Sequence, residues 1–401
     1  MAEIKKILLA ITILVIVLLA TGKGQTLSTD LPAGKAGSQG LTLESREIAS
    51  ACKQLQNREQ CYAKAFENLT KSTDRNYAFK ILRELQKVDP EARGCHFIAH
   101  AISTAETQKD PSKWKELMNS SPPDCSYGAA HGALEVYAST FPEGKLPKEE
   151  IPNLCNNPDT NNCTHILGHL LLVLNENDIP ESLKSCQSLP HDSLGKFECM
   201  TGVFMERITA LNLEVHGLAT KEALNWAERV PELETLCRAQ TGIPSVACWK
   251  EIVHAALIKF KNDPQQIVDF CEQAPGEEET RQCIDHSLGI MAAGYNFQLD
   301  KMDPICGVRV KNTDFPNRCY ANLVAATLST LPQEIPSAVK FCAKINPKYQ
   351  ESCFAMIGNS LRRASPEHKT TLAQECLHAP ESFRERCEFG GSNVIKFFNG
   401  N

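Results

Sequence analysis

From about residue 45 onward, apolar residues recur at spacings of three and four, which is the pattern of amphipathic helices. The segments 319–331 (CYANLVAATLSTL) and 353–363 (CFAMIGNSLRR) show it clearly. Between such stretches lie short segments with turn-forming Pro and many charged residues, such as 343–352 (AKINPKYQES) and 377–386 (LHAPESFRER). The pattern predicts an all-α chain in which one helix ends, a Pro-containing turn follows, and the next helix begins.

The cysteines mark the ends and starts of these helices and reveal an internal repeat. In the C-terminal half they form couples, and the second members recur at steps of 34 to 36 residues: Cys248, Cys283, Cys319, Cys353 and Cys387. Extended to the whole chain, the scheme gives ten cysteines at helix starts and eight at helix ends. A helix pair of this size cannot bury its apolar face alone, so we expect a disulfide-stapled α-solenoid of about ten helix-pair repeats of about 35 residues.

The spacing also predicts a disulfide framework. Each helix-end cysteine pairs with the next helix-start cysteine, and the two starts left over, Cys95 and Cys125, pair across neighbouring repeats, which requires Cα atoms within roughly 7 Å. A bridge that closes a short loop contributes on the order of 3 kcal/mol in the loop-entropy model. The expected bridges are Cys52–Cys61, Cys95–Cys125, Cys155–Cys163, Cys186–Cys199, Cys237–Cys248, Cys271–Cys283, Cys306–Cys319, Cys342–Cys353 and Cys376–Cys387.

The N-terminal residues 1–22 predict a membrane-targeting segment. Lys5 and Lys6 precede fourteen uncharged residues, 7–20. That length suits the apolar core of a signal peptide, while the flanking lysines and the polar residues after it also allow an uncleaved membrane anchor. In both cases the positive-inside rule sends the rest of the chain across the membrane. Residues 23–44 predict a flexible linker, and 45–401 an extracytoplasmic helical-repeat domain.

Composition narrows the function further. The 18 cysteines indicate an oxidising compartment, so we expect a protein anchored to the membrane by its N-terminus or secreted. The net charge of −6 argues against a nucleic-acid partner. No two cysteines are spaced as C-x-x-C, and H-E-x-x-H, G-x-S-x-G, P-loop and G-x-G-x-x-G motifs are absent. These absences exclude zinc ribbons, thioredoxin-type redox centres and several common classes of enzyme.

The repeat of helix pairs, each with one disulfide, resembles the cysteine-rich Sel1-like and TPR-like repeat proteins. The resemblance covers roughly residues 45–395 and is one of architecture. It implies a protein-interaction module whose concave face binds another protein, since this is the usual role of solenoids. We therefore expect a binding role rather than an enzymatic one.

Histidines gather at the helix starts of the early repeats and form the main candidate site. Five of the eleven fall within 74 residues: His96, His100, His131, His165 and His169. In five successive repeats, the fifth or sixth position after the start cysteine is His, His, His, Met205 and His. Equivalent positions of stacked repeats line up on one face, so we expect a ladder of side chains. The nearby Gly128, Gly132 and Gly168 indicate close backbone approach or room for something bound.

Two interpretations of this ladder stand side by side. In the first, neutral imidazoles hold a transition metal, zinc, copper or iron, with Glu135 or Met205 in support. In the second, half-buried histidines form hydrogen bonds between stacked helices. A metal centre in repeats 2–4 is thus the alternative to the interaction module. Asp285 and His286, at the start of a later helix, form a further candidate acid/base pair.

Overall fold

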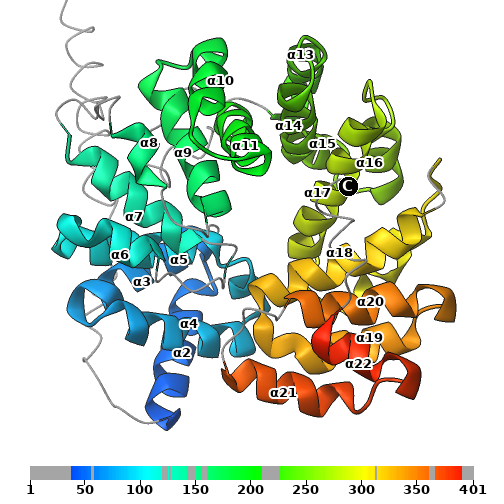
Figure 1. Ribbon diagram of the computed structural model, residues 1–401. Coiled ribbons are helices and arrows are strands. Elements are labelled where there is room, and N and C mark those ends of the chain that lie inside the picture. The colour runs from blue at the N-terminus through cyan, green and yellow to red at the C-terminus, as the bar shows by residue number, and fades with distance from the viewer. Residues whose placement is uncertain are drawn as a thin grey trace, which may run out of the picture. The chain divides into compact units, whose positions relative to one another are not determined.

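The computed structural model describes residues 38–55, 58–119, 125, 128–141, 150–155, 160–209, 226–311, 314–360 and 366–390. Within these ranges the chain consists of helices and the turns that join them, without strands, which confirms the all-α prediction (Figure 1). Helices that begin beside a helix-start cysteine are called start helices here: α3 (Arg58–Ser72), α5 (His96–Lys109), α7 (Gly128–Ser139), α9 (Thr160–Leu174), α11 (Ser193–Thr209), α14 (Ile243–Glu251), α17 (Glu277–Gly294), α18 (Phe315–Thr330), α20 (Pro347–Ser360) and α22 (Arg384–Phe389).

The remaining helices precede or lie between the start helices along the chain, except that α15 and α16 follow one another and, among the described residues, only 3₁₀ turns separate α17 from α18. They are α2 (Ser38–Cys52), α4 (Arg75–Val88), α6 (Trp114–Asn119), α8 (Ile151–Leu154), α10 (Ile179–Ser188), α13 (Trp226–Arg238), α15 (Val253–Lys259), α16 (Pro264–Cys271), α19 (Ile335–Lys344) and α21 (Pro366–Cys376). Each start helix packs against the next one in chain order, from α3 through α5, α7, α9, α11, α14, α17, α18 and α20 to α22. The residues that follow the start cysteines therefore lie on a continuous series of neighbouring helices.

Nine disulfides staple this arrangement. They join the same nine pairs that the spacing predicts, and none of the described cysteines is left free. The bridge between Cys95 and Cys125 spans a Cα–Cα distance of 5.1 Å, within the range a disulfide requires. Nine bridges in one chain indicate an oxidising, extracytoplasmic environment.

A recurring turn connects several of the helix pairs. Two consecutive residues with positive φ follow α9, α15 and α17, at Glu176–Asn177, Lys261–Asn262 and Asn296–Phe297. In the first two cases an aspartate follows, Asp178 or Asp263, whose carboxylate accepts a hydrogen bond from the backbone N–H three residues on and so caps the next helix. The same local chemistry in different repeats is what an internal sequence repeat should produce.

Glycines let two pairs of start helices approach closely. A Cβ built on Gly128 would lie 2.1 Å from the carbonyl oxygen of His96, so α5 and α7 can pack as they do only with glycine there. Gly168 on α9 and Gly202 on α11 face each other in the same way, and a Cβ on Gly202 would lie 1.9 Å from the carbonyl oxygen of His165. The glycines beside the histidines thus serve close backbone approach, as one of the two sequence interpretations expected.

The N-terminal boundary of the repeat domain differs from the prediction. Helix α2 begins at Ser38, so residues 38–44 of the expected linker are helical. The physical reason is tertiary: the Tyr77 hydroxyl of α4 donates a hydrogen bond of 2.6 Å to Glu44, whose side chain is buried between the two helices. Residues 1–37, with the expected signal peptide or anchor, lie outside the described residues. Among the described helices, none combines the length and the apolar composition that crossing a bilayer requires.

One contact joins helices far apart in the sequence. Arg93 forms an ion pair of 3.2 Å with Glu334 and donates a hydrogen bond of 3.4 Å to the backbone carbonyl of Asn296. An open solenoid, in which each repeat contacts only its neighbours, does not predict this contact.

Candidate metal centre

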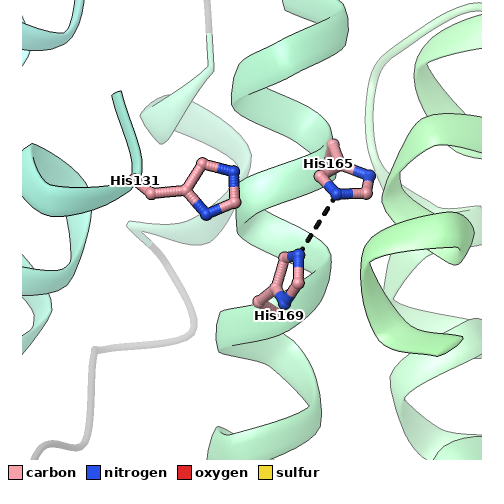
Figure 2. A group of neighbouring side chains, drawn as sticks. All are labelled: His131, His165 and His169. Atoms are coloured by element: carbon pink, nitrogen blue, oxygen red, sulfur yellow. Dashed lines mark hydrogen bonds between the residues drawn. The ribbon is translucent and has the colours of Figure 1, made fainter. Parts of the chain in front are cut away.

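Three of the five predicted histidines converge. His131 projects from α7, while His165 and His169 lie four residues apart on α9 and therefore share one helix face. Figure 2 shows the His131 ring directed toward the other two. One nitrogen from each ring lies within 4.8 Å of the others, and all three side chains are buried or half-buried. This arrangement presents three imidazoles to a common point.

Hydrogen bonds to α11 assign the tautomers of two of these rings. His169 Nδ1 lies 2.9 Å from a carboxylate oxygen of Glu206, and an ionised carboxylate can only accept, so Nδ1 carries the proton. His165 Nδ1 lies 2.8 Å from the hydroxyl of Thr201, which donates its own proton to the backbone carbonyl of Glu198. The hydroxyl therefore accepts from His165 Nδ1. With the protons placed in this way, Nε2 of each ring is left as the acceptor nitrogen.

The two Nε2 atoms lie 3.2 Å apart, the contact marked in Figure 2. With both Nδ1 atoms protonated, neither neutral ring has a proton on Nε2 to donate across this gap. A metal ion between the two Nε2 atoms would accept both lone pairs. Burial, together with the neighbouring imidazole of His169, holds the pKa of His165 well below its usual value, which keeps that ring neutral at pH 7.

The other two predicted ligands lie beside this cluster and are not among its three converging nitrogens. His96 on α5 packs edge-on against His131, with ring centroids 5.0 Å apart. His100 Nε2 lies 2.8 Å from a carboxylate oxygen of Glu135, so Glu135 partners His100. Met205 is half-buried on α11. The predicted histidines do lie on neighbouring helices, and the ring nitrogens of three of them converge: His131, His165 and His169.

A second group lies farther along the chain, where α14, α15 and α17 meet. It consists of Glu251, His254 and His286. His254 Nε2 and His286 Nε2 lie 3.2 Å apart, and each lies 3.4 Å from the same carboxylate oxygen, Glu251 Oε2. Asp285 and His286, the candidate acid/base pair, face different partners: Asp285 binds the guanidinium of Arg318 at 3.0 Å, while His286 faces Glu251.

Charges around Glu251 keep it ionised although it is fully buried. Burial alone would raise its pKa, but His286, His254 and Lys250 together hold the pKa well below the usual range. Lys250 Nζ lies 3.7 Å from Glu251 Oε1 and 3.3 Å from Glu198 Oε2. The two carboxylates outweigh the effect of burial on Lys250 and raise its pKa, so it stays protonated.

The two groups are neighbours. Glu198 lies between them, because one of its carboxylate oxygens is 4.0 Å from His165 Nδ1 and 3.3 Å from Lys250 Nζ. The charges of Glu251, Lys250 and His286 all act on the pKa of His165. A row of histidines and charged residues therefore continues from α5 to α17 across successive start helices.

Comparisons with known proteins give no relative: no family model, curated protein or solved structure matches the chain. The resemblance to Sel1-like repeats rests on the helix and cysteine pattern alone.

Proposed function

We propose that this chain is an extracytoplasmic metal-binding protein whose cluster of His131, His165 and His169 holds one zinc ion. The observation that carries the proposal is the pair of Nε2 atoms that face each other at 3.2 Å with a third imidazole beside them. Three neutral imidazoles form a zinc ligand set that leaves a fourth position for water.

The groups behind the ligands support a metal rather than a chance contact. The His169 Nδ1–H donates to a carboxylate, and the His165 Nδ1–H donates to a hydroxyl that is itself held by a backbone carbonyl. Metal-binding histidines almost always have such partners, since these fix the ring and raise the basicity of the free nitrogen.

The disulfides support the proposal by holding the ligand helices in place. Cys125 precedes His131 by six residues, and Cys163 precedes His169 by six, so each ligand helix is stapled within two turns of its ligand. A rigid scaffold lowers the ordering cost of binding. We propose that the helix pairs stack as an α-solenoid of about ten repeats that serves as this scaffold. Protein binding on a concave face remains a prediction.

The test is the zinc content of the full chain, exported into an oxidising compartment and purified without chelator. Wild type is compared with His169→Ala, with the milder His131→Asn, and with His378→Ala, an exposed histidine outside both groups. We expect the first two variants to lose one zinc equivalent and His378→Ala to lose none. Retention of wild-type zinc by both cluster variants would overturn the proposal, provided circular dichroism shows that they fold.

A further inference from the structure

We infer that Glu251, His254 and His286 form a second zinc site. This group shares no ligand with the His131 cluster, and its residues come from other helices. Each of the two sites can therefore be tested independently of the other.

The distances within the group match a tetrahedral metal. Zinc bonds to imidazole nitrogen and carboxylate oxygen of about 2.0–2.1 Å place tetrahedral ligand atoms about 3.3–3.4 Å apart. The three ligand atoms here lie 3.2, 3.4 and 3.4 Å from one another, a nearly equilateral triangle of that size. An octahedral ion with similar bonds would require edges of about 3.0 Å, as in iron sites with the same ligand types.

The carboxylate has the environment of a metal ligand. Glu251 is 0% exposed, and neither of its oxygens has a donor in hydrogen-bond geometry among the described residues. Burying a carboxylate is costly unless cations compensate it; Lys250 supplies one at Oε1, and a metal ion would supply another at Oε2. Lys250 approaches Oε1, and both imidazoles approach Oε2, so a metal would bind through Oε2 alone.

Local chain geometry brings the three ligands together. Helix α14 ends at Glu251 and α15 begins at Val253. Glu251 and His254, three residues apart in the sequence, therefore lie on either side of the break between these two helices. His286 comes from α17, which packs against both α14 and α15. Two imidazoles and one carboxylate are a ligand set that zinc takes in proteins, whereas Mg²⁺ and Ca²⁺ prefer oxygen ligands alone.

The experiment measures zinc per chain, and the visible spectrum after replacement by Co²⁺, in wild type and variants. Glu251→Gln removes the charged ligand without changing its shape. His286→Ala changes a side chain that is 28% exposed, so its folding cost is small. Glu277→Gln, exposed on the same helix as His286, is the matched control. Non-reducing peptide mapping checks that all nine disulfides form in each variant.

We expect two zinc ions in wild type and in Glu277→Gln, one in Glu251→Gln and in His286→Ala, and none when Glu251→Gln is combined with His169→Ala. The cobalt spectrum should lose one tetrahedral component in Glu251→Gln and in His286→Ala, and none in Glu277→Gln. Wild-type zinc content in both Glu251→Gln and His286→Ala would overturn the second site. If Glu251→Gln empties the chain while His169→Ala changes nothing, the second site stands and the His131 cluster fails.

Discussion

Replacing Gly202 by alanine tests whether close helix approach positions the histidine cluster. The added Cβ would lie 1.9 Å from the carbonyl oxygen of His165 and 3.0 Å from Gly168 Cα. Both neighbours are backbone atoms of α9, so no side chain can swing away to make room. An ordinary contact needs about 3.4 Å, so α9 and α11 would have to separate by about 1.5 Å.

The magnitude follows from two opposing effects. Overpacking of this kind costs about 1–3 kcal/mol and occasionally more, and contact with the rigid backbone of α9 places Gly202→Ala at the upper end. Alanine in a helix interior recovers about 1 kcal/mol relative to glycine. We therefore expect the free energy of unfolding to fall by about 2 kcal/mol. Separation of the helices also pulls Thr201 and Glu206 away from the ligand histidines, which should weaken zinc binding by about tenfold or more.

The assay is guanidinium unfolding with disulfides intact and zinc removed, followed by a zinc titration. Gly289→Ala is the matched control, because Gly289 also lies inside a helix and its Cβ would meet nothing within 4 Å. This control should be stabilised by up to about 1 kcal/mol. If Gly202→Ala were as stable as Gly289→Ala, the argument from helix approach would be refuted.

Three further predictions follow from individual contacts. Glu206→Gln weakens the hydrogen bond that the His169 ring donates through Nδ1, so zinc affinity should fall by about 10–100-fold. An unchanged affinity in isothermal titration calorimetry would show that Glu206 does not support the ligand His169. The Cys95–Cys125 bridge closes a 30-residue loop, whereas the Cys155–Cys163 bridge closes an eight-residue loop. Replacing both cysteines of the first bridge by alanine should therefore lower the free energy of unfolding by about 1 kcal/mol more than the same change at the second. Denaturant titration of the two double variants measures this difference, and equal losses would contradict the prediction. Burial and a hydrogen bond to Asp89 raise the pKa of Tyr62 to about 12. The folded state therefore holds the Tyr62 proton where the unfolded chain loses it. The contribution of Tyr62 to stability should fall by no more than about 2.7 kcal/mol as the pH rises from 10 to 12, measured as the difference between wild type and Tyr62→Phe, because Tyr77 and Tyr320 also have raised pKa values and remain in the variant.

The helices and their cysteine pairing could be predicted because their signals are local and repeated. Proline and charged residues between apolar periods set the turns, and each short bridge joins cysteines 8 to 13 residues apart in the sequence. The contact of Arg93 with Glu334 could not be predicted in this way, because it depends on how small rotations between repeats accumulate along the chain.

The candidate site was predictable to the extent that equivalent positions of neighbouring repeats meet. His131 and His169 both follow a start cysteine by six residues, and their rings are adjacent. His286 follows its start cysteine, Cys283, by three residues, whereas His254 follows Cys248 by six. The two histidines therefore do not occupy equivalent repeat positions, although their ring centroids lie only 5.2 Å apart. Neighbouring helices are offset along their axes, and the repeat period carries no information on that offset. Glu251 was missed because carboxylates are frequent and its burial is tertiary.

The central claim is that the histidine and carboxylate groups on successive start helices bind metal. The most direct measurement is zinc per chain by inductively coupled plasma mass spectrometry, on wild type and on the combined His169→Ala and Glu251→Gln variant, after equilibration with zinc and removal of free ion. The account predicts two ions in wild type and none in the combined variant. Equal zinc content in both proteins would contradict it.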